Sequence, residues 1–187
     1  MGLVRGADAL SEEYINNPVI KQYIDNPNCT IILFENPPYA ETTSLEHQRT
    51  KKSATSSAWK NTFVVKEMKK VVKGAVSNDL GNAFIWSAFK YYLRQPTDSY
   101  IVYSPVKYWK SQHLINKEFI KGFAFNRRHF HTNIDACIMC ALWSNVDKNV
   151  TSLKITGYDI LNNNQLSTPI ELSVDRVYEL FSTRYYN

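Results

Sequence analysis

Apolar positions in this chain fall into short runs separated by polar stretches, a pattern that predicts alternating strands and helices. Residues 30–34 form a fully apolar run of strand length, typical of a strand buried on both faces of a parallel sheet. Residues 62–72 place valines and a methionine on one side and lysines on the other, which predicts an amphipathic helix. A second helix is predicted over residues 79–93, with its cap at residues 77–79.

The rest of the chain follows the same alternation. Helical spacing over residues 8–25 is interrupted at Asn17 and Pro18, because the residue before a proline avoids helical geometry. Further strands are predicted at 100–103, 124–125, 134–143, 153–160 and 170–172, and short helices at 106–115, 117–120 and 174–181. Residues 40–60 and 126–133 are polar and predict loops. This order predicts an α/β fold in one domain over residues 1–187.

One tetrapeptide carries recognisable chemistry: Asn36-Pro37-Pro38-Tyr39, directly after the apolar run. The two prolines fix the backbone and remove two N–H donors, and the Asn36 amide adds a carbonyl oxygen that accepts hydrogen bonds. Tyr39 adds a flat aromatic face. Such a group suits a planar ring with an exocyclic amino group. Its place after a buried strand is where open α/β sheets bind ligands.

The tetrapeptide resembles the catalytic motif of S-adenosylmethionine-dependent amino-methyltransferases, in the form found in DNA adenine-N6 methyltransferases of restriction-modification systems. The resemblance covers residues 25–145 and implies a partial Rossmann-like sheet, mixed and with flanking helices, followed by a short β-rich tail at 146–187. It implies that Asn36 and the Pro37 carbonyl hold the amino group of an adenine flipped out of double-stranded DNA. It also implies that Tyr39 stacks on that base.

The resemblance extends to residues downstream of the motif. It implies that Phe125 stacks on the other face of the base, with Phe130 as the reserve candidate. Asp79 and Leu80 resemble, weakly, the family segment that borders the cofactor, which Asn36 also adjoins. Basic residues near these positions are candidates for phosphate contacts. These are Lys51, Lys52, Arg127 and Arg128.

The chain departs from the family in its glycines. A nucleotide-type cofactor needs a glycine-rich turn for close backbone approach, and none of the six glycines is spaced as Gly-x-Gly. We therefore expect a carboxyl-terminal catalytic half, incomplete by itself, whose S-adenosylmethionine site lies mainly in an upstream half or a second subunit. Two alternatives stay open: methyl transfer to protein glutamine or RNA guanine, and an inactive remnant that binds DNA.

The composition of the 187-residue chain bears on which partners and which cellular compartment are expected. Its net charge of +5 and its 13% aromatic content fit a nucleic-acid partner without requiring one. The longest apolar runs are far shorter than the roughly 18 residues of a membrane span, so no membrane partner is expected. Three cysteines indicate a reducing compartment, the bacterial cytoplasm under this interpretation. Cys137 and Cys140 lack a second pair for zinc, and we interpret them as structural.

Overall fold

A computed structural model describes residues 8–38, 59–106, 109, 116–126, 137–163 and 165–175. The chain divides into two compact units. One, here called the helical unit, runs up to Ile31 and continues over Pro38–Arg94. The other, here called the sheet unit, comprises Ile32–Pro37 and the chain from Gln95 onward.

Helices of the helical unit begin at the residues that the sequence favours as caps. Ser11 and Asn17 accept hydrogen bonds from backbone N–H groups in the first turns of the first two helices, and Asp79 does the same for α5. The break at Asn17 and Pro18 is confirmed. The elements are α1 (Glu12–Ile15), α2 (Pro18–Ile24), α4 (Phe63–Val71), the 3-10 helix η2 (Gly74–Asn78), α5 (Leu80–Ser87) and the π-helix η3 (Ala88–Tyr92).

Helix α4 follows most of the amphipathic pattern that predicts it, but Val71 in its last turn, predicted on the apolar side, is 69% exposed. Val64, Val65 and Met68 are fully buried, whereas Lys66 and Lys70 are exposed. The helix predicted over 79–93 is also confirmed, as α5 followed without a break by η3.

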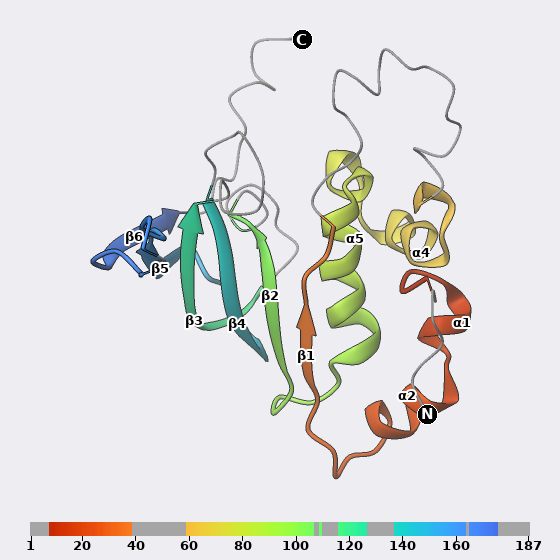
Figure 1. The fold of residues 1–187 in the computed structure, drawn as a ribbon. Coiled ribbons are helices and arrows are strands. Elements are labelled where there is room, and N and C mark those ends of the chain that lie inside the picture. Colours follow the sequence, from red (N-terminus) through yellow and green to blue (C-terminus); the bar gives the residue numbers. More distant parts are fainter. Residues whose placement is uncertain are drawn as a thin grey trace, which may run out of the picture. The chain divides into compact units, whose positions relative to one another are not determined.

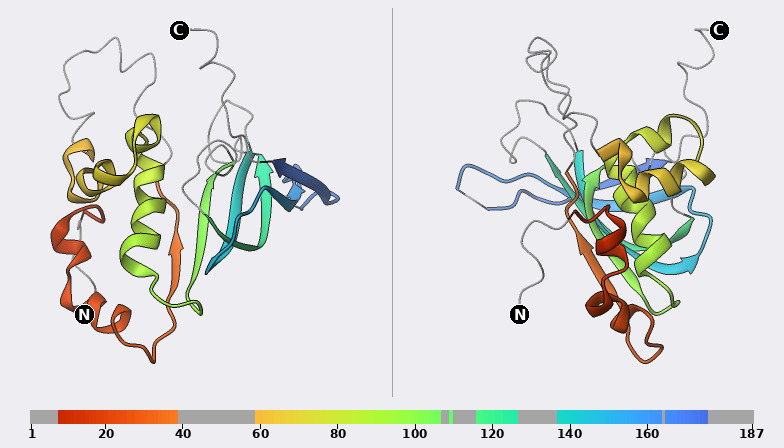
Figure 2. Two further views of the ribbon diagram at one scale, coloured as in Figure 1. Left: turned by 180° about the vertical axis from the view of Figure 1, so that it is seen from behind. Right: turned by 90° about the vertical axis from the view of Figure 1, so that its right-hand side faces the viewer.

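Six strands form one mixed sheet in the sheet unit. They are β1 (Ile32–Glu35), β2 (Ser99–Pro105), β3 (Lys117–Asn126), β4 (Cys137–Asp147), β5 (Ser152–Tyr158) and β6 (Ile170–Asp175). Their order across the sheet is β1-β2-β4-β3-β5-β6. β1 pairs with β2 in parallel and β3 with β5 in parallel, while β4 is antiparallel to both of its neighbours. Figure 1 shows β1, β2, β4 and β3 side by side, and Figure 2 gives two further views.

The register divides the sheet into two unlike faces. Tyr100 and Val102 of β2 and Met139 of β4 have no exposed surface, as befits core positions. Residues on the opposite face include Phe34, Tyr103 and Phe123. Phe34 of β1 is paired with Ile101 of β2, two residues before Tyr103. Tyr103 of β2 and Phe123 of β3 are both paired with Cys140 of β4, so the register brings these side chains together. This second face, here called the open face, carries several exposed apolar side chains.

Several predictions from the sequence are wrong in detail. Residues 117–120, predicted as a helix, are the start of β3, because pairing with β4 decides a short apolar segment whose local preference is ambiguous. The helix predicted from 174 does not begin there, since Val174 pairs with Leu153 inside β6. The 124–125 strand is the end of the much longer β3. Burial of the 30–34 run on both faces is also wrong: Ile32 is 66% exposed and Phe34 62%.

The α/β fold class is confirmed, and the mixed sheet is consistent with a partial Rossmann-like arrangement. The other predicted strands are confirmed with shifted ends. Most of 106–115, residues 40–58 and residues 127–133 lie outside the described residues. No helix in the described ranges combines the length and the apolar character that crossing a bilayer requires.

Candidate functional site

Four strands of the sheet unit bring their carboxyl ends to one edge. β1, β2, β3 and β5 all run in the same direction, because β4 is antiparallel to both β2 and β3. Asn36 follows the end of β1, and Pro105, Asn126 and Tyr158 end the other three strands. Polar and aromatic groups far apart in the sequence therefore meet at the edge where α/β sheets bind ligands.

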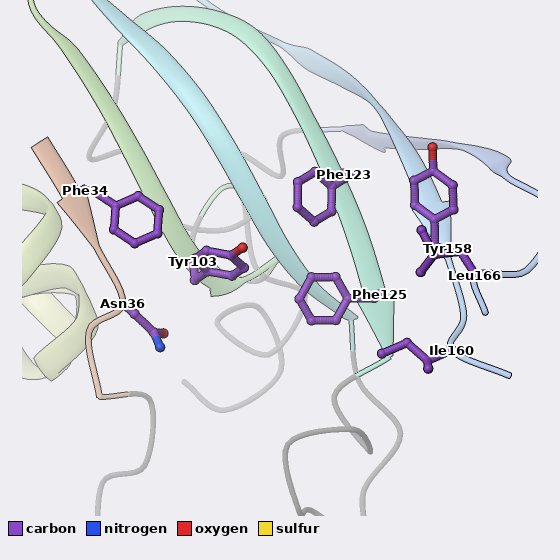
Figure 3. A pocket seen from close by; sticks show the side chains of 8 residues that line it. All are labelled: Phe34, Asn36, Tyr103, Phe123, Phe125, Tyr158, Ile160 and Leu166. Carbon is purple, nitrogen blue, oxygen red and sulfur yellow. The ribbon is translucent and has the colours of Figure 1, made fainter. Parts of the chain in front are cut away.

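A pocket of about 590 Å³ opens on the open face at this edge, and we call it the aromatic pocket. Figure 3 shows the aromatic rings of Phe34, Tyr103, Phe123, Phe125 and Tyr158 around it and the Asn36 amide just after β1. Its volume falls within the range of about 300–1,000 Å³ that is usual for ligand pockets. The lining residues are Phe34, Asn36, Tyr103, Phe123, Phe125, Tyr158, Ile160 and Leu166.

Four rings of the aromatic pocket form a row of pairwise contacts that crosses from β1 over β2 to β3. The centroids of Phe34 and Tyr103 lie 5.9 Å apart, edge to face, and those of Tyr103 and Phe125 lie 6.2 Å apart. The rings of Phe123 and Phe125 stack with their centroids 5.9 Å apart and their planes inclined by 27°. These separations are normal for favourable aromatic pairs, so the rings support one another's orientation. The pocket thus offers ring faces and edges to a planar ligand, together with one amide.

The predicted catalytic tetrapeptide is only partly described. Asn36 is exposed and lines the aromatic pocket, Pro37 is buried and Pro38 is exposed. Tyr39 lies outside the described residues, so its predicted stacking role stays a prediction. Phe125, predicted as the second stacking residue, lines the same pocket as Asn36. The other candidates also lie outside the described residues: Lys51, Lys52, Arg127, Arg128 and Phe130.

Glu35 precedes Asn36 and points to the opposite face of β1, as alternation along a strand requires. Its Oε2 accepts a hydrogen bond of 2.6 Å from the hydroxyl of the fully buried Tyr100. Burial raises the pKa of Glu35 to about 7, although the Tyr100 hydrogen bond acts in the other direction by stabilising the carboxylate. The carboxyl of Glu35, which titrates near neutral pH, is therefore next in sequence to Asn36, which lines the aromatic pocket.

Tyr103 and Cys140 lie next to each other on β2 and β4. Burial, followed by the hydrogen bond to Cys140 and the charge of its thiolate, raises the pKa of Tyr103 above its ordinary value. Burial also raises the pKa of Cys140 and of Cys137, so both thiols stay protonated near neutral pH. Both cysteines are free. Among the described residues, no three His, Cys, Asp or Glu side chains gather as metal ligands would.

The cofactor candidates Asp79 and Leu80 belong to the helical unit, whereas Asn36 belongs to the sheet unit. The Asp79 carboxylate caps α5, accepting from the Gly81 backbone N–H at 2.9 Å. This is a structural role.

Sequence reasoning did not assign Phe34, Phe123, Tyr158, Ile160 or Leu166 to the site. The period-2 spacing of Phe123 and Phe125 was a usable signal, because it puts both rings on one face of a strand. Tyr103 of β2 also lines the pocket. Comparison with protein-family models and with curated proteins returns no match for this chain.

Proposed function

We propose that this chain is the catalytic and base-binding half of a site-specific DNA methyltransferase that methylates N6 of adenine. The observation that carries the proposal is the convergence of Asn36 and Phe125 on one aromatic pocket. Asn36 directly follows β1, whereas Phe125 lies on β3, and the two residues are distant in sequence. An adenine flipped out of the duplex is a planar ring with an amino group on its edge, which matches an amide beside aromatic faces.

The tetrapeptide would act on the amino group of this base. The Asn36 amide oxygen and the Pro37 carbonyl each accept one amino hydrogen, which draws the nitrogen lone pair away from the ring and makes the nitrogen a better nucleophile. Positioning of this kind lowers a barrier by fixing the reacting atoms in a productive geometry. Phe125 and Tyr39 would hold the ring between them. Tyr103 would support Phe125 through its ring contact, and Phe34 would in turn support Tyr103.

S-adenosylmethionine would supply the methyl group. The residues of this chain do not fit a complete site for it, because no Gly-x-Gly turn is present and the Asp79 carboxylate caps α5. Most of the cofactor site therefore belongs to an upstream half or a second subunit. The other partner under this proposal is double-stranded DNA, with Lys51, Lys52, Arg127 and Arg128 near its phosphates. The bacterial cytoplasm is the corresponding setting.

Substitution of Asn36 tests this proposal. The gene region that encodes the chain, with its natural neighbours, is expressed in cells free of adenine methylation, and N6-methyladenine in their DNA is quantified. We expect N6-methyladenine from the natural sequence and a loss of at least about 100-fold with Asn36→Ala, because the amino group is no longer positioned. Purified Asn36→Ala protein should still bind duplex DNA. Asn162→Ala, in an exposed turn, is the matched control and should remain active.

Persistent N6-methyladenine with Asn36→Ala would refute the catalytic assignment. Label transferred from tritiated S-adenosylmethionine to protein or RNA instead of DNA would refute the adenine assignment in favour of glutamine or guanine as acceptor.

A further inference from the structure

β3 presents a run of five residues of which the proposed function uses only the last. In chain order these residues are lysine, glycine, phenylalanine, alanine and phenylalanine. Their pairing with β4 is continuous, so alternation along the strand separates them by face. Lys121, Phe123 and Phe125 lie on the open face. The two small residues between them, Gly122 and the fully buried Ala124, lie on the opposite face.

This order of residues has an established physical use on exposed sheets. It matches the first five positions of the strand pattern with which RNA-recognition-motif sheets stack the bases of a single strand. Aromatic residues two positions apart stand side by side on one face and each offers a ring to one base. The match is confined to one strand, so what it transfers is the chemistry of that strand surface and not a fold.

The rings of Phe123 and Phe125 are placed to receive two consecutive bases. Their centroids lie 5.9 Å apart, and Figure 3 shows both rings on the same side of β3. Neighbouring nucleotides of a duplex strand are separated by only about 3.4 Å along the axis, so consecutive bases reach both rings when the strand is unpaired and extended. Phe123 is 40% exposed, which leaves its ring open to such a base.

The aromatic pocket also has room for more than one base. Its volume is about 590 Å³, and it extends past the two β3 rings to Tyr158, Ile160 and Leu166. Pockets of this size usually hold drug-sized ligands, which are larger than a single nucleobase. An adenine held beside Asn36 therefore leaves the part of the pocket near Tyr158 unfilled.

Charge on the open face favours a nucleic-acid strand as the occupant. Lys121 is exposed and has no ion-pair partner among the described residues, so its ammonium group can meet a phosphate. Lys154 of β5 contributes less, because its Nζ lies 3.4 Å from a carboxylate oxygen of Glu171. The whole chain carries a net charge of +5, and Arg127 and Arg128 follow β3 directly in the sequence.

We propose that the open face binds an unpaired segment of DNA, with the target adenine on Phe125 and a neighbouring base stacked on Phe123. Lys121 contacts a phosphate of the same segment. That the strand is DNA rests on the proposed function, whereas the stacking of two bases does not. Because unpairing a base from a duplex costs free energy, single-stranded DNA binds this face more tightly than the same sequence as a duplex. The base beside the adenine thereby becomes part of what the site recognises.

Fluorescence anisotropy with the intact chain, without S-adenosylmethionine, tests the proposal. The probe is a labelled DNA strand with one adenine, long enough for the roughly 4–16 nucleotides of typical single-strand sites. It is titrated as a single strand and as a duplex, and an RNA of the same sequence is titrated in parallel. We expect the single-stranded DNA to bind at least about 10-fold more tightly than the duplex.

Two substitutions on β3 separate stacking from charge. Phe123→Ala should weaken single-strand binding about 5-fold or more, because one stacked base is lost. Tyr23→Ala, which removes a 56% exposed ring from α2, is the matched control and should bind like the natural chain. Lys121→Gln should reduce the slope of log affinity against log salt concentration by about 0.7, the effect of one phosphate contact on a single strand. Lys66→Gln, at an exposed position of α4, should leave that slope unchanged.

An abasic site on either side of the adenine identifies the base that Phe123 holds. On one side the abasic site should weaken binding to the natural chain but not weaken it further in Phe123→Ala, because both changes remove the same contact. Since Phe123 and Lys121 are exposed, their variants should keep the circular dichroism of the natural chain.

Four outcomes would overturn the proposal: duplex binding as tight as single-strand binding, equal effects of Phe123→Ala and Tyr23→Ala, full additivity of Phe123→Ala with both abasic sites, or tighter binding of the matched RNA. The assay contains no methyl transfer. An absence of N6-methyladenine in cells would therefore refute the proposed function and leave the two-base stacking intact, while methylation together with any of the four outcomes would do the reverse.

Discussion

The carboxyl of Glu35 links the stability of the protein to pH, and Glu35→Gln should remove that link. In the folded protein, burial holds the pKa of Glu35 at about 7, against 4.5 for the group in water. Between these values the folded state keeps a proton that the unfolded state has released. The free energy of unfolding must therefore fall as pH rises from about 4.5 to about 7, and Glu35 contributes no further change above that range.

The size of the effect follows from the shift. Each pKa unit corresponds to about 1.4 kcal/mol, so a rise from 4.5 to about 7 corresponds to about 3 kcal/mol. Glutamine keeps a side-chain carbonyl that accepts from the Tyr100 hydroxyl and it cannot ionise. We therefore expect Glu35→Gln to match the natural chain near pH 4.5 and to exceed its unfolding free energy by up to about 3 kcal/mol at pH 8.

Urea unfolding at a series of pH values from 4.5 to 8, followed by circular dichroism, measures this difference. The comparison between variants removes the contribution of all other titrating groups, which both proteins share. Glu171→Gln is the matched control for the loss of a carboxylate, because the Glu171 side chain is 71% exposed and a surface ion pair such as Lys154–Glu171 contributes only about 0–1 kcal/mol. Parallel curves for the natural chain and Glu35→Gln would show that the Glu35 carboxyl is not desolvated, and would refute the reasoning.

Two further substitutions test the packing of each unit. Gly122→Ala should lower the free energy of unfolding by about 1–3 kcal/mol, since its Cβ would lie 2.9 Å from the Cys140 carbonyl oxygen and 3.2 Å from the Phe119 ring. Unchanged urea stability would contradict the close packing of β3 on β4 at this position. Asp79→Ala should cost about 1 kcal/mol by removing the cap that accepts from the Gly81 N–H, and Asp79→Asn should restore it. Equal losses for the two Asp79 variants would contradict the capping role.

Local sequence signals predicted the helical unit well. The cap at Asp79, the break at Pro18 and the amphipathic pattern of α4 each act within a few residues, and each appears in the structure. Local signals failed at the start of β3, where residues 117–120 were predicted as a helix. Its strand form depends on pairing with β4, including register shifts around Phe119, and no local pattern encodes that partner.

The residues of the candidate site also fall into two groups: those that local sequence indicates and those that only the strand arrangement brings together. Residue chemistry and the strand before it singled out Asn36, but Phe125 was reached only through the family resemblance. Phe34, Tyr103 and Tyr158 join Asn36 and Phe125 in the pocket only because of the strand order. β3 lies between β4 and β5, and β5 is parallel to β3. Strand order is set by packing across the whole sheet, so one sequence without relatives does not determine it.

The position of β1 in the chain has a consequence for synthesis. β1 is translated before β2, its strand partner, and about 60 residues separate Glu35 from Ser99. At about 5–20 residues per second, the nascent β1 waits roughly 3–12 s for that partner. The β5 and β6 strands, by contrast, are neighbours in the sequence and pair soon after they emerge. During the wait the apolar residues Ile32, Leu33 and Phe34 are unpaired and open to chaperones and to other nascent chains, so a misassembly of β1 on the ribosome would also displace Asn36, which follows it.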